Sequence, residues 1–389
     1  MMISRRRHKI IALLLVFISS IVGLALVESG MHLSGLDYAL VWQPDPQLGW
    51  RHVPGAQRLW TEEGRGLVKI NQLGFRDRER TFDKSTNVFR IAVFGDSMTE
   101  AVQVNLDQTF TYLIEEKLKE KHYSVEVLNF GVSGYSPVQE LLLFRREGVR
   151  YGSDIVIWAV FLDNDISGCH PGLTVSEWGS PFLVETKDFQ VDFSRAEQSV
   201  KEFQQQPFSW IRAHSSIYRF LSMWRWRLMA QLNALPVISQ AQVPKRFQHY
   251  EKRSSPLPEW EAAWSCFERT VKQFSEEVHQ QGARLLIVSV PSAYEVNAKS
   301  WADNLAAIPQ MSQHEWDLLL PHQRLKAIAV KHDIAVIEPH DTFKQLQDGP
   351  PIYFGNAGHL TPHGHMKLAE IVEKFILNNF LSLDKIAPN

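Results

Sequence analysis

Five short apolar runs recur along the chain beyond residue 88, each a nearly continuous stretch of Val, Ile and Leu. Runs of this kind are typical of strands that are covered on both faces of a parallel sheet. Amphipathic patterns separate the runs, and in the clearest, residues 260–278, apolar side chains recur at intervals of four and three residues, which predicts a helix. The strands are predicted at 90–94, 125–130, 154–161, 283–290 and 333–337, with further helices after Asp107, over 314–331 and over about 363–380.

The alternation of strands and helices predicts right-handed crossovers and therefore an α/β fold, a three-layer sandwich with a five-stranded parallel sheet. The interval at about 167–257 has no run of the core-strand type and carries an aromatic, basic, helix-like stretch. It predicts an inserted helical cap, whose Trp and Phe side chains are expected to pack within the cap because aromatics at helical spacing usually face a core; a ligand box is the alternative. The basic residues of the cap could instead meet lipid phosphates or an anionic glycan. These residues are Arg219, Arg225 and Arg227.

The amino terminus has a different pattern. Basic residues at 5–9 precede an uncharged apolar run at 10–27, which is long enough to cross a bilayer as a helix. We expect an uncleaved transmembrane anchor, because the apolar region of a cleaved signal peptide is shorter, about 7–15 residues. A cleaved signal peptide is the alternative, although its only candidate site, at 23–25, lies inside the apolar run. Because positive residues remain cytoplasmic, residues 1–9 are expected to form a cytoplasmic tail, with everything after Glu28 in a periplasm or its equivalent.

Residues 28–87 are rich in Pro and Gly and lack helical periodicity. This composition predicts a juxtamembrane region of loops and short strands. The segments 48–50 and 71–77 have the character of tight turns with aromatic anchors, and we expect them to pack an N-terminal arm on the core. The main domain is predicted at 88–386.

Composition narrows the classes of function. The 389 residues are 44% hydrophobic and 22% charged, as in a globular protein, and the net charge of −2 provides no basic field for nucleic acid. Cys169 and Cys266 are the two cysteines. They permit a single disulfide in an oxidising compartment, with free thiols as the alternative, because spacing does not show whether two sulfurs meet.

Polar residues follow the predicted strands at their carboxyl ends. Because parallel strands share one carboxyl edge, residues far apart in sequence are expected to converge there. The first strand is followed by Gly95-Asp96-Ser97, the second leads into Asn129-Phe-Gly-Val-Ser-Gly134, the third is followed by Asp163-Asn164-Asp165, and His359 precedes the last helix.

This set contains what acyl chemistry on a serine requires: a nucleophile, a base and oxyanion donors. Ser97 is the predicted nucleophile and His359 the predicted base. The backbone N–H groups of Ser97 and Gly134 and the side-chain amide of Asn164 are the predicted oxyanion donors. Each has a structural alternative, Ser97 as a helix N-cap and Gly134 and Asn164 as turn residues.

These blocks together resemble the SGNH or GDSL hydrolases, whose name lists the Ser, Gly, Asn and His found here in the family's order at Ser97, Gly134, Asn164 and His359. The resemblance extends from about residue 88 to the C-terminus, apart from the cap. It implies a flavodoxin-like sheet and esterase, deacetylase or related acyl-transfer chemistry that needs no metal or other cofactor.

Two departures from the family pattern stand out. The family usually has Gly two residues before the Asn, where this chain has Leu162, and commonly has Asp two or three residues before the His, where it has Asn356 and Ala357. We expect Asn356 to hold the His359 ring through its carbonyl oxygen, although a neutral partner stabilises imidazolium less well than a carboxylate. A carboxylate from elsewhere in the chain, or a Ser–His dyad, is the alternative. Asp96 and Asp165 are expected to support the site.

A metal site is the competing interpretation of the histidines at 359, 363 and 365. Pro362 argues against one helix face that carries all three, and Glu or Cys ligands are lacking nearby. His365 is expected instead to pack on or cap the last helix.

The sequence predicts a membrane-anchored serine esterase that removes O-acyl groups, O-acetyl in particular, from an extracytoplasmic glycan through an acyl-enzyme. One alternative is an O-acyltransferase that uses the same serine. Another, motivated by the missing Asp, is a catalytically weak glycan-binding or scaffolding protein of envelope polysaccharide assembly.

Overall fold

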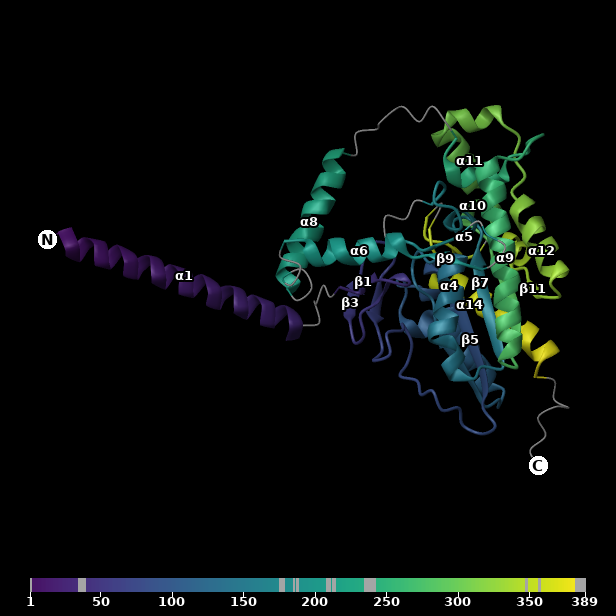
Figure 1. Ribbon diagram of the computed structural model, residues 1–389, viewed down its shortest axis with the longest axis horizontal. Helices are drawn as coiled ribbons and strands as arrows, with labels where there is room; N and C mark the ends of the chain where they lie inside the picture. Colours follow the sequence, from purple (N-terminus) through teal and green to yellow (C-terminus); the bar gives the residue numbers. More distant parts are fainter. Residues whose placement is uncertain are drawn as a thin grey trace.

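The computed structural model shows a three-layer α/β body from which one long helix projects (Figure 1). The structure describes residues 2–33, 40–174, 179–184, 186, 189–207, 211, 215–233, 243–346, 349–355 and 358–381.

The central sheet has five strands, all paired in parallel. In the order β6-β5-β7-β10-β11, the strands appear as 2-1-3-4-5 when numbered along the chain, which is the flavodoxin-like order. The predicted five-stranded parallel sheet is therefore confirmed. The strands are β5 (Phe89–Gly95), β6 (Val125–Asn129), β7 (Ile155–Phe161), β10 (Arg284–Val290) and β11 (Ala335–Ile337).

Helices cover both faces of the sheet because successive strand residues point to opposite sides. Phe94 and Trp158 belong to one core, with α4 (Pro137–Arg146), α9 (Pro258–Gln280) and α12 (Leu320–Lys331). Val93 and Ile157 belong to the other, with α3 (Phe110–Glu120), α13 (His340–Gln345) and α14 (Pro362–Asn379). The shorter elements are α2 (Ser97–Glu100), η1 (Leu106–Gln108), η2 (Gly148–Tyr151), α5 (Asp165–Gly168), α10 (Ala293–Val296), α11 (Ala298–Ala307) and η4 (Pro309–Gln313).

Two predicted elements are shorter than expected. The helix predicted over 314–331 begins at Leu320, with Pro321 in its first turn. Proline is tolerated there because a backbone N–H in the first turn has no partner within the helix. The last strand begins at Ala335 rather than at 333. Asp333 has φ +55°, which closes the turn between α12 and β11 and excludes this residue from the strand.

The predicted insertion carries helices, as expected, and also a short β-hairpin. Its elements are β8 (Phe182–Leu183), β9 (Val191–Asp192), α6 (Ser194–Gln205), α8 (Ser216–Asn233) and η3 (Lys245–Tyr250). The expected packing of its aromatics within a cap is wrong for Trp224, which is 60% exposed. Helix α8 packs against the N-terminal helix α1. The side chain of Arg227 lies outside the described residues. The predicted limits of the insertion and of the main domain remain predictions.

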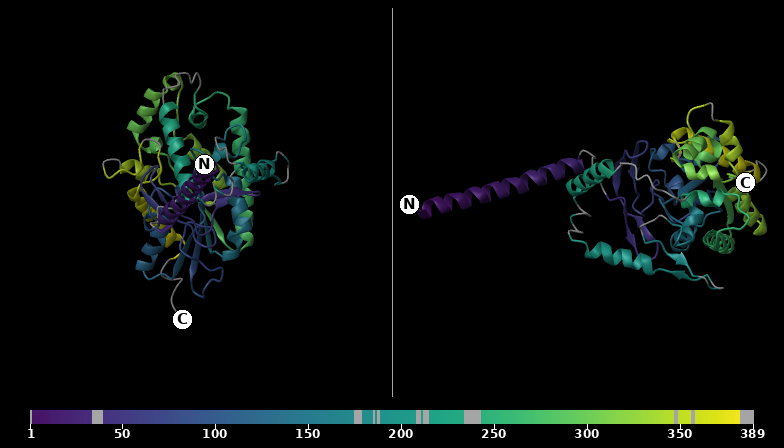
Figure 2. Two further views of the ribbon diagram at one scale, coloured as in Figure 1. Left: turned by 90° about the vertical axis from the view of Figure 1, so that its left-hand side faces the viewer. Right: turned by 90° about the horizontal axis from the view of Figure 1, so that it is seen from above.

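The N-terminal helix α1 (Met2–Leu33) projects away from the body in Figure 1 and in the right-hand view of Figure 2. The segment Arg7–Leu33 is long and apolar enough to cross a membrane, and its apolar stretch is not buried in the protein. The predicted helix is therefore present, whereas its crossing of a membrane and its orientation remain predictions.

Two short hairpins form the predicted layer of loops and strands between α1 and the sheet. They are β1 (Trp42–Asp45) with β2 (Gly49–His52), and β3 (Gln57–Trp60) with β4 (Gly66–Lys69). Trp50 and Phe75, from the two predicted tight turns, are buried in the core of the α4 face. The expected packing of this arm on the core is confirmed. Cys169 and Cys266 are both buried and are not joined in a disulfide.

Candidate active site

Ser97 lies where β5 turns sharply into α2. Asp96 is the N-cap of α2 and its Oδ1 accepts the Met98 N–H at 2.9 Å, so Ser97 is the first helical residue rather than the cap. A Cβ on Gly95 would lie 2.2 Å from Thr99 Oγ1 and 2.9 Å from the Ala159 carbonyl oxygen. Glycine is therefore required at this turn, which presents the serine hydroxyl at the carboxyl edge of the sheet.

His359 lies against Ser97 although 262 positions separate them in the chain. Its Nε2 is 2.8 Å from Ser97 Oγ, a hydrogen-bond distance for a base and the hydroxyl it deprotonates. The loop that carries His359 is tied down on both sides. The Phe354 N–H donates to the His359 carbonyl at 2.8 Å, and Thr361 caps the N-terminus of α14.

The other ring nitrogen of His359 contacts a carboxylate, that of Glu63. His359 Nδ1 is 2.5 Å from Glu63 Oε2, and the His359 backbone N–H donates to Glu63 Oε1 at 3.1 Å. Burial alone raises the pKa of Glu63, but the hydrogen bonds and charge of His359 outweigh it and hold the pKa below its usual value. Glu63 therefore stays ionised at neutral pH beside the ring.

Glu63 belongs to the turn between β3 and β4, outside the predicted main domain. The turn lies close to the loop that follows α2. A Cβ on Gly64 would be 2.4 Å from the Gln103 carbonyl oxygen, and one on Gly66 would be 2.4 Å from that of Val104. A Cβ on Gly358 would be 2.1 Å from Glu63 Oε1, so three glycines permit the approach.

Glu63 was not predicted from the sequence. Asn356 was expected in this role, with a carboxylate from elsewhere in the chain or a Ser–His dyad as the alternative. Asn356 and Ala357 lie outside the described residues. The carboxylate that contacts His359 Nδ1 is that of Glu63, which is far from His359 in the sequence. The only local signal was the run Glu62-Glu63-Gly64-Arg65-Gly66, which does not distinguish one glutamate from the other.

Asn164 is held beside the serine turn by Asp96. Its Nδ2 donates to Asp96 Oδ2 at 2.9 Å, and Ser97 Oγ lies 3.4 Å from the same carboxylate oxygen. Burial raises the pKa of Asp96, and the hydrogen bond from Asn164 opposes the rise. An amide nitrogen carries two N–H groups, so one bond to Asp96 fixes the side chain and leaves the other N–H for a ligand.

Gly134 lies in the loop after β6 with φ +76°, a conformation that favours glycine. The N-terminal arm holds this loop. Trp50 Nε1 donates to the Ser133 carbonyl at 3.0 Å, and the Ser133 N–H donates to Glu100 Oε2 at 2.5 Å. Glu100 is itself paired with His52 at 2.8 Å, and although burial raises its pKa, the charge of His52 and these hydrogen bonds leave the pKa below its usual value.

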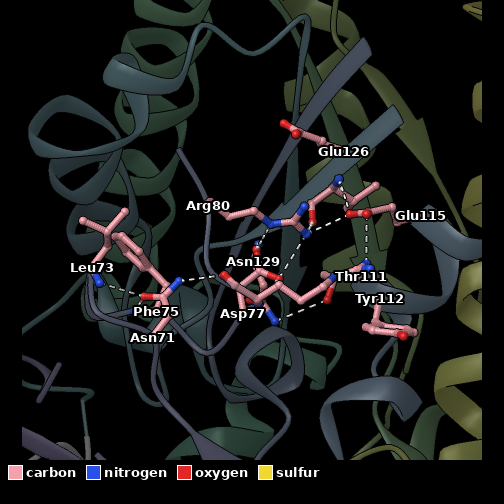
Figure 3. A network of polar contacts seen from close by, with 12 residues as sticks. Asn71, Leu73, Phe75, Asp77, Arg80, Thr111, Tyr112, Glu115, Glu126 and Asn129 are labelled. Atoms are coloured by element: carbon pink, nitrogen blue, oxygen red, sulfur yellow. Dashed lines mark hydrogen bonds and ion pairs between the residues drawn. The ribbon is translucent and has the colours of Figure 1, made fainter. Parts of the chain in front are cut away.

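A second network ties the arm to the start of the same loop (Figure 3). Arg80 joins Asp77 Oδ2, Glu115 Oε2 and the Val127 carbonyl, each at 2.8 Å. The Asn129 N–H donates to Asp77 Oδ2 at 3.3 Å, and the Asn129 side chain donates to the Thr99 carbonyl at 2.9 Å. The segment at 71–77 therefore has a structural role that also positions the loop from Asn129 to Gly134.

Asp165 has no contact with Ser97 or His359 among its described hydrogen bonds. Its Oδ2 accepts the Phe161 N–H at 2.7 Å, which secures the end of β7 next to Asn164. Burial, together with the charge of the nearby Glu140, raises the pKa of Asp165 well above its usual value.

His365 packs in the core, as predicted. It stacks on Phe110 and accepts the Phe110 N–H at 3.3 Å, and burial lowers its pKa to about 3. Among the described residues, no group of three His, Cys, Asp or Glu side chains is placed to hold a metal ion.

The sequence matches no known family profile and no curated protein. Solved structures with a similar fold include TesA, at 10% identity and a TM-score of 0.37, covering 74% of this chain and 97% of that one. The acetyl xylan esterase AlAXEase has 13% identity and a TM-score of 0.40, covering 74% and 100%. A lipase/acylhydrolase from Enterococcus faecalis has 11% identity and a TM-score of 0.38, covering 74% and 95%.

These identities and TM-scores are low. The fold is therefore defined by the chain's own strand order and by the groups that meet at the sheet edge. The order is flavodoxin-like, and Ser97, His359 and Asn164 lie together at the carboxyl ends of β5 and β7. The chain therefore has the sheet and the serine–histidine contact that its resemblance to the SGNH hydrolases implies.

Proposed function

We propose that this protein is a serine ester hydrolase of the SGNH type that removes O-acyl groups through an acyl-enzyme. The observation that carries the proposal is the continuous chain of contacts from Ser97 Oγ to His359 Nε2 and from His359 Nδ1 to Glu63. A nucleophile, a base and an acid that orients the base have this arrangement in serine hydrolases on unrelated folds.

The reaction follows from this order of contacts. His359 Nε2 takes the proton of Ser97 Oγ as the oxygen forms a bond to the acyl carbon. The tetrahedral intermediate expels the alcohol, which receives that proton from His359. Water then attacks the acyl-enzyme, again losing a proton to His359, and the carboxylic acid leaves as Ser97 recovers its hydrogen. Glu63 acts as the positioning residue that sets the ring tautomer and stabilises the imidazolium.

The oxyanion of the tetrahedral intermediate is expected to accept hydrogen bonds from the backbone N–H groups of Ser97 and Gly134 and from the side-chain amide of Asn164. A preorganised donor of this kind acts on the charge that develops in the transition state. Asn164→Ala is expected to lower kcat by about 10²–10³-fold with little change in KM, measured with p-nitrophenyl acetate. Asn379→Ala, at the exposed end of α14, is the matched control and should retain the rate. Equal rates for both variants would remove Asn164 from the oxyanion site.

The substrate is assigned as an O-acetylated glycan outside the cytoplasm. The apolar run of α1 behind a basic tail supports the location. The scaffold alternative was motivated by a missing acid, and Glu63 supplies a carboxylate at that place. Acetate release from an acetylated xylan tests the assignment. If acetylated acceptor sugar forms and no acetate is released, the enzyme is a transferase instead.

The nucleophile is tested by covalent labelling of the full-length protein in detergent. A fluorophosphonate probe should phosphonylate the wild type at one site, the peptide that contains Ser97, and His359→Ala should abolish labelling because the hydroxyl loses its base. Ser254→Ala, which changes an exposed serine, should label like the wild type. An unreactive wild type would contradict the proposed hydrolase.

A further inference from the structure

Helix α8 carries a largely exposed apolar stripe. Phe220, Leu221, Trp224 and Leu228 are 36%, 59%, 60% and 44% exposed. With the half-buried Ile217, they recur at helical spacing and occupy about 100° of the helix surface. A contiguous exposed apolar stripe of this kind marks a contact surface rather than a face in water.

The N-terminus of α8 is attached to the outer end of α1. Glu28 accepts hydrogen bonds from the Ser215 hydroxyl at 2.9 Å, from the Ile217 N–H at 3.2 Å and from the Ser216 N–H. A carboxylate is favourable there because the first N–H groups of a helix lack intrahelical partners. These bonds place the beginning of α8 at the level of Glu28 along α1.

Glu28 marks the position at which α1 would leave a bilayer. The apolar run at 10–27 ends immediately before it, and a helix of that length rises about 27 Å, close to the roughly 30 Å hydrocarbon thickness of a membrane. In Figure 1, α8 runs across the axis of α1 rather than along it, and Figure 2 also shows α8 beside the end of α1. If α1 crosses a bilayer, α8 therefore extends along the bilayer surface.

We propose that α8 is an interfacial helix whose apolar stripe enters the headgroup and acyl boundary of the outer leaflet. The occupant is the lipid bilayer itself, because α8 starts where α1 emerges from it. Trp224 is suited to this depth, since Trp is enriched at membrane interfaces, and the exposed Arg225 flanks the stripe, within reach of lipid phosphates. The proposal depends on α1 as a membrane span and is independent of the acyl chemistry.

Adjacent positions on α8 provide a matched test. Leu221→Cys and Trp224→Cys lie on the stripe, whereas the exposed Ser222 lies on another face, so Ser222→Cys is the control. Each full-length variant is labelled with the fluorophore NBD and placed in nanodiscs of phosphatidylcholine and phosphatidylglycerol that contain a shallow nitroxide lipid. Cys169 and Cys266 are buried, and the wild type carried through the same labelling gives the background.

We expect strong loss of fluorescence at positions 221 and 224 and little loss at 222, because an interfacial helix buries its apolar face about 5–10 Å into the boundary. Equal quenching at all three positions, or none at 221 and 224, would overturn the proposal. So would a chain that does not co-elute with nanodiscs. If the fluorophore at position 221 is shielded from water but not quenched by the nitroxide lipid, and only when two chains occupy one disc, the stripe binds a second copy of this chain instead. Ester hydrolysis by the same samples reports separately on the catalytic proposal.

Discussion

Replacing Glu63 with glutamine is expected to lower kcat for p-nitrophenyl acetate by about 10⁴-fold. Glutamine preserves the size of the side chain but removes the charge that stabilises the imidazolium. Its amide can also donate to Nδ1, which favours the wrong ring tautomer. The 2.5 Å contact to Nδ1 and the backbone hydrogen bond from His359 both involve this carboxylate, so the loss is expected mainly in kcat, with parallel slowing of fluorophosphonate labelling.

Glu62→Gln is the matched control, because Glu62 is the preceding residue and pairs with Arg58 at the surface. It should retain the wild-type rate, since exposed ion pairs contribute little. Thermal unfolding distinguishes a positioning role from a structural one, and Glu63→Gln should unfold cooperatively at pH 7, at a temperature only slightly below that of the wild type because it lacks the charge that His359 stabilises. If Glu63→Gln retains a tenth of the activity or more, Glu63 is not the acid of the site.

The charge of Glu63 also gives a direction for the pH dependence. Its pKa in the folded protein is lowered from 4.5, so its contribution to stability is fully present above that value. The contribution is lost as the pH falls through the folded-state pKa. The wild type should therefore lose stability relative to Glu63→Gln only in acid below about pH 4.5, as thermal unfolding at a series of pH values would show.

Replacing Ser97 with alanine is expected to lower kcat by about 10⁵–10⁶-fold, because no acyl-enzyme can form without the hydroxyl. The fold should be unaffected, since Asp96 rather than Ser97 caps α2. The described hydrogen bonds of the Ser97 hydroxyl are those to His359 and Asp96. The measurement is acetate release together with fluorophosphonate labelling, in which this variant should not react.

Ser254→Ala again provides the control, and the combination of Ser97→Ala with Glu63→Gln tests whether the residues act as a unit. Groups that serve one step are strongly non-additive, so the double variant should be about as slow as Ser97→Ala alone. A Ser97→Ala protein with wild-type hydrolysis would mean that another group performs the chemistry.

The sheet was predictable because each strand carries its own signal. A strand covered on both faces must be apolar at nearly every position, and the buried runs of β5, β7 and β10 appear directly in the sequence. Ser97, Asn164 and His359 were predictable for a related reason. Topology brings the carboxyl ends of parallel strands to one edge, so residues at those ends meet without any knowledge of side-chain packing.

Glu63 and the exposed face of α8 were not predictable in the same way. Glu63 lies in an N-terminal hairpin whose docking depends on close approaches at Gly64, Gly66 and Gly358, and no periodic pattern reports such contacts. Trp224 was expected in a cap core because helical spacing identifies an apolar face but not what covers it.

The sequence by itself determined the class of the sheet, the apolar N-terminal helix and three of the groups that meet at the sheet edge, because hydrophobic period and strand direction are local properties. Only the tertiary structure decided which carboxylate faces His359 Nδ1, how the N-terminal arm supports the loop before Gly134, and where α8 lies. These depend on contacts between segments far apart in the chain, and many different pairings of such segments are compatible with the same local pattern.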